Sequence, residues 1–151
     1  EMIPEPQLLI DENETPLVIK GIDLQQMLIR MNERIEFLYD REHTIGHSYF
    51  MKLNGIEDEE TGWSTLQDIF KRQILPLLQE YFYDQWDRIR LVLGDNNKPS
   101  EQQFVGVKPS TSIEHLFGRN ADLDIDNERV LYQIQEEAFT LPESYIQIYN
   151  H

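Results

Sequence analysis

Two segments of the sequence carry apolar residues three and four positions apart, which is the spacing of an amphipathic α-helix. The apolar residues of the first segment are Leu24, Met27, Leu28, Met31, Ile35 and Leu38. Those of the second are Leu66, Ile69, Phe70, Ile74, Leu77, Leu78, Tyr81 and Phe82. Because each helix must bury its apolar stripe against another element, this spacing predicts a mostly α-helical bundle.

Side chains that cap helices indicate where these two helices begin. Asp23 is predicted to cap the first helix, with Gln26 as its reciprocal partner three residues later. The apolar stripe predicts that this helix runs to about Tyr39. Ser64, with Gln67 three residues later, is predicted to cap the second helix in the same way.

Other residues predict where helical structure is interrupted. The acidic segment 54–62 contains an Asn-Gly pair, which is typical of a loop, and residues 46–53 before it are predicted to form a short helix. Pro76 lacks a backbone donor and should kink the second long helix. Asp84 is predicted to cap a further helix that Gly94 ends.

The last third of the sequence has a different character. Residues 104–107 and 130–134 are rich in β-branched and aromatic side chains, which predicts two short strands. A helical turn is predicted between them at residues 113–117. Thr140 and Glu143 have the spacing of a capping box, so a closing helix is predicted to begin there.

The length of 151 residues predicts a single compact unit. We expect residues 1–22 to form an extended linker, because three prolines interrupt them, and residues 23–95 to form the helical bundle. Residues 96–151 should form a small β-hairpin-like element and the closing helix, packed on the bundle.

The sequence is strongly acidic, with 28 Asp and Glu residues against 13 Lys and Arg residues and a formal net charge of -15. Binding to nucleic-acid phosphates needs clusters of Lys and Arg, and none occurs here, so we expect no direct nucleic-acid binding by this chain. The absence of cysteine excludes disulfides and cysteine-based zinc sites. Without an apolar run of about 20 residues or a signal peptide, we expect no membrane span and a cytoplasmic location.

The segment DREHTIGHSYF, residues 40–50, is the densest group of polar and aromatic residues. His43 and His47 are four positions apart, a spacing that can direct two imidazoles toward one metal ion. Zinc hydrolases with this spacing have a Glu directly after the first His, whereas Thr44 follows His43 here, and Gly46 weakens a helix through this point. The segment is therefore predicted to hold no catalytic metal, and a polar joint between two helices remains the plain alternative.

The sequence carries an incomplete motif for a calcium site and no motif for a phosphate-binding loop. The segment DLDIDNE, residues 122–128, alternates acids as calcium loops do, but it lacks the central Gly and the terminal Glu of that motif. No glycine-rich phosphate loop of the GxxxxGK[ST] type is present. We therefore expect no catalytic residue for nucleotide hydrolysis in this chain.

Three long segments together resemble one protein family. They are MNERIEFLYDREHTIGHSYF (31–50), ILPLLQEYFYDQWDRIRLVLGD (74–95) and YQIQEEAFTLPESYIQIY (132–149). They resemble the C-terminal part of the McrB-like AAA+ GTPases of 5-methylcytosine-specific restriction systems. The resemblance covers most of residues 22–95 and resumes near residue 130.

The resemblance implies that this chain is the helical lid of an AAA+ nucleotide-hydrolysing motor. The Walker motifs, the first sensor and the arginine fingers would belong to an AAA+ core that precedes the lid, so the chain alone is expected to be inactive. The parent protein would use GTP or ATP with Mg²⁺. Its expected partners are that core, neighbouring subunits in a ring, and the nuclease subunit of the restriction complex.

The resemblance also implies a site. Residues 45–49 match the position of the second sensor, which lies at the start of a lid helix and faces the nucleotide. The nucleotide-sensing residues implied at or beside this position are Arg41, His43, Gly46, His47 and Ser48. A helix start favours phosphate, histidine can supplement it, and glycine would allow close approach of the backbone.

An alternative function of a different class follows from the net charge alone. A chain with a charge of -15 is also suited to be a free-standing acidic protein-interaction module, or a DNA mimic that occupies a basic site. A mimic needs its acids spread over one exposed face, whereas the acids here cluster in the predicted loops and helix flanks.

Overall fold

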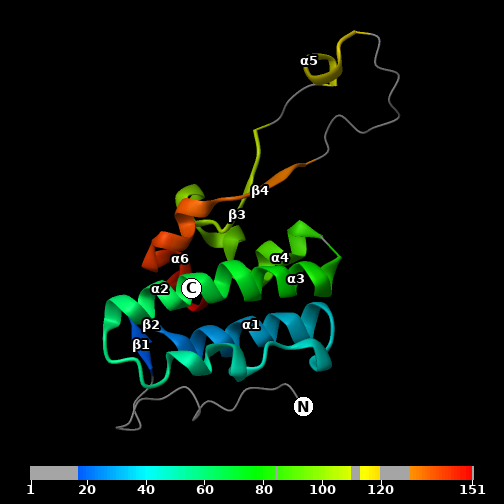
Figure 1. The fold of residues 1–151 in the computed structure, drawn as a ribbon. Coiled ribbons are helices and arrows are strands. Elements are labelled where there is room, and N and C mark those ends of the chain that lie inside the picture. Colours follow the sequence, from blue (N-terminus) through cyan, green and yellow to red (C-terminus); the bar gives the residue numbers. More distant parts are fainter. Residues whose placement is uncertain (1–16, 84, 110–112, 120–129, 151) are drawn as a thin grey trace.

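The computed structural model describes residues 17–83, 85–109, 113–119 and 130–150, and it is mostly helical (Figure 1). The six α-helices of this part are α1 (Leu24–Leu38), α2 (Glu59–Ile69), α3 (Leu75–Phe82), α4 (Trp86–Leu93), α5 (Ile113–Phe117) and α6 (Pro142–Tyr149). Two small antiparallel sheets accompany them among the described residues, β1 with β2 and β3 with β4. The predicted class, a mostly α bundle with a small two-stranded element and a closing helix, is confirmed.

The chain enters α1 through a tight hairpin, β1 (Val18–Ile19) and β2 (Ile22–Asp23). Lys20 and Gly21 form its turn with φ angles of 51° and 81°, and two positive φ angles are typical of a two-residue hairpin turn that matches strand twist. The prediction of a simple extended linker is therefore wrong for residues 17–22, and residues 1–16 lie outside the described part.

The start of α1 is held by side chains from both ends of the chain. Asp23 Oδ1 accepts a hydrogen bond from the Gln26 backbone N–H at 3.1 Å, which confirms the predicted N-cap. The Gln26 side chain bonds to the Asp23 carboxylate, whereas the Asp23 backbone N–H donates to the Tyr149 hydroxyl at 2.9 Å. The capping box is therefore completed by α6 instead of by Gln26.

The beginning of α2 differs from the prediction. The helix begins at Glu59, because Asp58 Oδ2 accepts from the Thr61 backbone N–H at 3.3 Å and from the Thr61 hydroxyl at 2.7 Å. The first two helical residues are glutamates, whose charge is favourable near a helix N-terminus. The predicted cap at Ser64 and the predicted loop through Gly62 are therefore wrong.

A π-helical turn, η4 (Phe70–Ile74), connects α2 directly to α3. The Leu75 N–H bonds to the Phe70 carbonyl, five residues back, and Pro76 follows in the first turn of α3. Proline cannot donate a backbone hydrogen bond and its ring crowds the carbonyl four residues earlier, so a wide turn accommodates it. The interruption predicted at Pro76 is therefore this π-turn.

The predicted end of α4 is confirmed, whereas its predicted cap is not tested. Gly94 ends the helix with φ 74°, and a Cβ there would lie 3.3 Å from the Gln147 carbonyl oxygen. Asp84, the predicted cap, lies outside the described residues. The helix begins after Gln85, whose side chain makes no capping hydrogen bond.

The predicted strands are confirmed as a shorter pair, β3 (Val105–Val107) and β4 (Tyr132–Ile134). Before them lie two 3₁₀ turns, η5 (Asp95–Asn97) and η6 (Ser100–Gln102), and after them a third, η7 (Glu136–Thr140). The predicted capping box of α6 is wrong, because the Thr140 hydroxyl bonds to the Glu137 carbonyl at 2.6 Å.

One apolar core joins the helical bundle to the C-terminal elements. Its centre is an aromatic cluster in which the ring centroids of Phe104 and Phe70 are 5.5 Å apart. Tyr145 from α6 packs edge-on against both rings, and its hydroxyl donates to the Phe139 carbonyl at 2.8 Å. A buried Tyr hydroxyl is tolerated because it has this partner.

A buried ion pair lies beside this cluster, where α4 meets β3. Asp95 Oδ1 contacts Lys98 Nζ at 2.9 Å, and both side chains have 0% exposure. The Asp95 carboxylate also accepts from the backbone N–H groups of Phe104 and Val105, at 3.1 and 2.9 Å. One carboxylate therefore fixes the path of the chain from η5 to the first residue of β3.

Candidate functional site

The segment between α1 and α2 forms two 3₁₀ turns, η2 (Arg41–His43) and η3 (His47–Leu53). We call residues 39–49 the joint. Asp40 caps η2, because its Oδ1 accepts from the His43 backbone N–H at 2.8 Å. The predicted short helix at residues 46–53 is confirmed as the 3₁₀ turn η3.

The ring of His43 is held in one orientation. Its Nδ1 lies 2.6 and 2.8 Å from the two carboxylate oxygens of Asp40. Its centroid lies 4.4 Å from that of Tyr39 and 5.2 Å from that of Tyr81. Hydrogen bonding from the His43 side chain is the main cause that lowers the pKa of the Asp40 carboxyl below its ordinary value. Asp40 therefore keeps its charge and holds the ring by its Nδ1 edge.

The middle of the joint is fixed to α1 by one buried amide. Asn32 is 6% exposed, its Oδ1 accepts from the Ile45 backbone N–H at 2.5 Å, and its Nδ2 donates to the Ile45 carbonyl at 2.9 Å. The Ile45 side chain is fully buried in the core. Asn32 thus satisfies both backbone groups of a residue that water does not reach.

The structure places the predicted nucleotide-sensing residues on both sides of this fixed point. Arg41 and His43 lie in η2, and His47 and Ser48 begin η3. Arg41 and Ser48 are exposed, and the two histidines are half-buried. Gly46 is buried, with φ -75°, so its backbone conformation is open to any residue type. No hydrogen bond or ring contact joins His43 to His47 within the described chain.

The described residues offer little geometry for the alternative of a metal site. Among residues 17–83, 85–109, 113–119 and 130–150, no group of three His, Asp or Glu side chains is placed to hold a metal ion. His43 and Asp40 form a pair, and His43 Nδ1 is already hydrogen-bonded to the carboxylate. The acidic segment 122–128 lies outside the described residues.

Sequence reasoning missed the residues that hold the joint in place, namely Asn32, Tyr39 and Tyr81. Asn32 carries a recognisable signal, since it follows Met31 on the apolar stripe of α1 and a buried polar residue needs a partner. Tyr81 is 38 positions from His43 along the chain, and only the packing of α3 brings the rings together.

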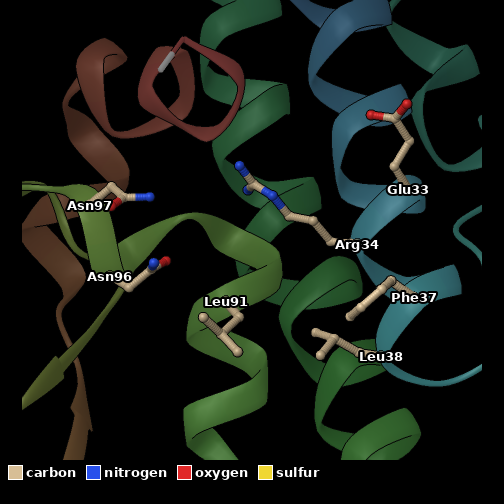
Figure 2. Close-up of a pocket in the computed structure, with 7 residues that line it drawn as sticks. All are labelled: Glu33, Arg34, Phe37, Leu38, Leu91, Asn96 and Asn97. Carbon is tan, nitrogen blue, oxygen red and sulfur yellow. The ribbon is translucent and has the colours of Figure 1, made fainter.

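A second surface feature lies between α1, α4 and η5, where a hollow of about 370 Å³ opens (Figure 2). We call it the Phe37 hollow; its lining residues are Glu33, Arg34, Phe37, Leu38, Leu91, Asn96 and Asn97. The Phe37 side chain is 91% exposed, which is unusual for an aromatic residue on a helix. Arg34 Nη1 donates to the Val92 carbonyl at 3.0 Å, so this wall of the hollow is fixed to α4.

None of the described helices is both long enough and apolar enough to cross a membrane. Comparison with curated proteins finds no match. The family model of the McrB alpha-helical lid domain matches residues 23–90, which begin at the cap of α1, include the whole joint and end within α4. Residues 23–90 of this chain therefore belong to the family of McrB alpha-helical lid domains.

Proposed function

We propose that this chain is the lid of a McrB-like AAA+ nucleotide-hydrolysing motor in a modification-dependent restriction system. The observation that carries the proposal is the family match over residues 23–90, which includes the joint predicted to face the nucleotide. The parent motor would bind GTP or ATP with Mg²⁺ through its AAA+ core, and the lid would close over the nucleotide.

The joint is suited to sense nucleotide because its outer groups are donors on a fixed backbone. Arg41 offers a guanidinium that suits phosphate oxygens, and His47 offers an imidazole at the first position of η3. The Asn32 amide fixes the buried residue between them, so both turns are positioned before ligand binds. Such preorganisation is what makes a donor effective when charge develops on a phosphate.

Replacement of Arg41 or His47 by alanine in the full-length protein is expected to lower nucleotide turnover by on the order of tenfold to a hundredfold. Each change removes a donor near the phosphates and leaves the core intact, because both side chains lie outside it. Turnover is measured by phosphate release under saturating nucleotide, with circular dichroism to confirm the fold.

Lys52→Ala is the matched control, because it removes an exposed cation from the same 3₁₀ turn as His47 at its far end. It should leave turnover unchanged. Full turnover in both the Arg41 and His47 variants would mean that the joint is only a connection between helices. The purified 151-residue chain should hydrolyse neither GTP nor ATP, and measurable hydrolysis would contradict its assignment as a lid.

We further propose that the Phe37 hollow contacts a neighbouring subunit of the motor. An aromatic side chain that is 91% exposed beside an apolar hollow is the kind of residue that anchors protein interfaces. None of the residues that line the hollow belongs to the aromatic cluster that joins the bundle to α6.

Phe37→Ala in the full-length protein is expected to weaken oligomer assembly by about tenfold or more, since truncation of a central aromatic anchor commonly has this effect. Sedimentation velocity with and without nucleotide measures the change. Met51→Ala is the control, because Met51 is also exposed, at 40%, and does not line the hollow. Equal assembly of the Phe37 variant and the unmodified protein would refute this contact.

A further inference from the structure

The ribbon formed by β3 and β4 has one edge that the bundle covers in part and one edge that is open among the described residues. The register pairs Val105 with Ile134, Gly106 with Gln133 and Val107 with Tyr132. The Gln135 N–H bonds to the Phe104 carbonyl and the Lys108 N–H to the Leu131 carbonyl, so hydrogen-bonded pairs fall on alternate residues.

This alternation fixes the direction of the remaining backbone groups. Gly106 and Gln133 form the central hydrogen-bonded pair, so the N–H and C=O groups of Val105 point away from β4. On β3 these groups have partners, because the Val105 N–H donates to Asp95 and its carbonyl accepts from Arg90 Nε at 3.0 Å. The bundle thus covers the outer edge of β3 at Val105.

The described residues provide no such cover for the outer edge of β4. The backbone groups of Tyr132 and Ile134 point away from β3, and no hydrogen bond to them exists within the described chain. Ile134 is 41% exposed, and its neighbours Val130 and Leu131 are 52% and 45% exposed. An exposed strand edge with unpaired N–H and C=O groups is a template for a further strand.

A groove rich in glutamate lies at the end of this edge. Its volume is about 530 Å³, and its lining residues are Glu101, Gln133, Ile134, Gln135, Glu136, Glu137, Ala138, Thr140 and Leu141. Three of these are glutamates, and Lys71 lies 3.3 Å from Glu136. The other two glutamates make no ion pair among the described residues, and the apolar side chains of Ile134 and Leu141 line the same groove.

We propose that the open edge of β4 binds an extended segment of another protein, one that alternates apolar and basic side chains, as a third strand. The Tyr132 and Ile134 backbone groups would hydrogen-bond the added strand, Ile134 and Leu141 would contact its apolar side chains, and Glu101 and Glu137 would pair with its Lys or Arg side chains. A two-stranded ribbon alone is marginally stable, so a third strand also stabilises it.

Charge favours a basic partner over a second copy of this chain. Antiparallel pairing of two β4 edges would bring together two chains that each carry a formal charge of -15, with like grooves at the contact. A segment with Lys or Arg is attracted by the same charges. The inference concerns a surface outside the matched lid residues 23–90, so it does not depend on the proposed motor function.

The test uses a synthetic peptide of about six residues that alternates Val and Lys, because a strand of that length spans the edge. Its affinity for the 151-residue chain is measured by isothermal titration calorimetry at two salt concentrations. The control peptide has the same sequence with an N-methyl group on every residue, which removes all its backbone donors and keeps every charge.

Ile134→Pro is the decisive variant, because the backbone donor that it removes points away from β3 and lies outside the β3–β4 ladder, and proline keeps a smaller apolar side chain at this position. Gln133→Pro is its matched control, since it removes a donor inside the β3–β4 ladder and should open the ribbon itself. We expect Ile134→Pro and the N-methylated peptide each to lower the affinity by about tenfold, with the ribbon intact by NMR in Ile134→Pro. The double variant Glu101→Gln with Glu137→Gln should lower the affinity for the peptide and reduce the dependence of that affinity on salt.

Two results would overturn the proposal. Equal affinity of the Ile134→Pro variant and the unmodified chain, or of the two peptides, would mean that only bulk charge attracts the peptide. The second result is a dimer of the chain in sedimentation experiments that Ile134→Pro abolishes. The edge would then bind a second copy of the chain.

Discussion

Asp95→Ala is expected to lower the free energy of unfolding by about 3–5 kcal/mol, the largest effect among our stability predictions. The change leaves the fully buried Lys98 ammonium without a counter-charge. It also leaves the backbone N–H groups of Phe104 and Val105 without their acceptor. Urea denaturation followed by circular dichroism measures the loss.

The double variant Asp95→Leu with Lys98→Met is the control for this prediction. Apolar side chains of similar volume often replace a buried ion pair at little cost, so part of the lost stability should return. The two N–H groups remain unsatisfied in that variant, so the recovery should be incomplete. A loss below about 1 kcal/mol for Asp95→Ala would show that water or a shifted backbone replaces the carboxylate.

The same pair predicts a change of stability with pH. Burial, opposed by the Asp95 charge, lowers the pKa of Lys98 from 10.5 to about 8. Between these two values the unfolded chain binds more protons at this site than the folded chain, so the contribution of Lys98 to stability rises with pH. Lys98→Met should remove this rise of stability with pH. Urea denaturation repeated across this pH range therefore gives a second test of the buried Asp95–Lys98 pair.

Asn32→Leu is expected to lower the free energy of unfolding by about 2–4 kcal/mol and to release the joint from α1. The amide satisfies both the N–H and the C=O of the fully buried Ile45, and leucine can satisfy neither. Urea denaturation measures the stability, and NMR chemical shifts of residues 40–49 report the position of the joint.

Glu36→Leu is the matched control, because Glu36 is an exposed residue of the same helix and should change stability by less than about 0.5 kcal/mol. In the full-length protein, Asn32→Leu should lower nucleotide turnover as Arg41→Ala does, although Asn32 itself is too deeply buried to reach a ligand. Unchanged shifts across the joint in Asn32→Leu would contradict the positioning role.

Local rules predicted those features of the fold that depend on a few neighbouring residues. The Asp23 cap and the Gly94 end are of this kind, since one side chain or one positive φ angle decides each. The start of α2 was mispredicted because Asp58 and Ser64 are both suitable caps, and the earlier one lets the helix begin with two glutamates. Gly62 also packs closely against Ile19, since a Cβ at Gly62 would lie 3.4 Å from Ile19 Cδ1. That contact favours the longer helix and is invisible in sequence.

The residues of the candidate site also fall into those that the sequence could predict and those that it could not. Sequence and resemblance indicated the outward residues Arg41, His43, His47 and Ser48, because they lie together in eight consecutive positions. They could not indicate Tyr81, which meets His43 only after α3 has packed. The role of Asp40 as the partner of the His43 ring was also hidden, because the same spacing suits a metal ligand.

The π-turn has a consequence for the angular phase of the long helix. Five buried residues, Leu66, Phe70, Ile74, Leu78 and Phe82, are each four positions apart. In a regular α-helix a step of four residues advances by about 400°, so such a stripe would drift about 40° per step and turn away from the core. The wide turn at Phe70–Ile74 reduces this drift midway. The π-turn holds one residue more than the α-helical turn it replaces, and this extra residue lets α3 keep its apolar face toward the core.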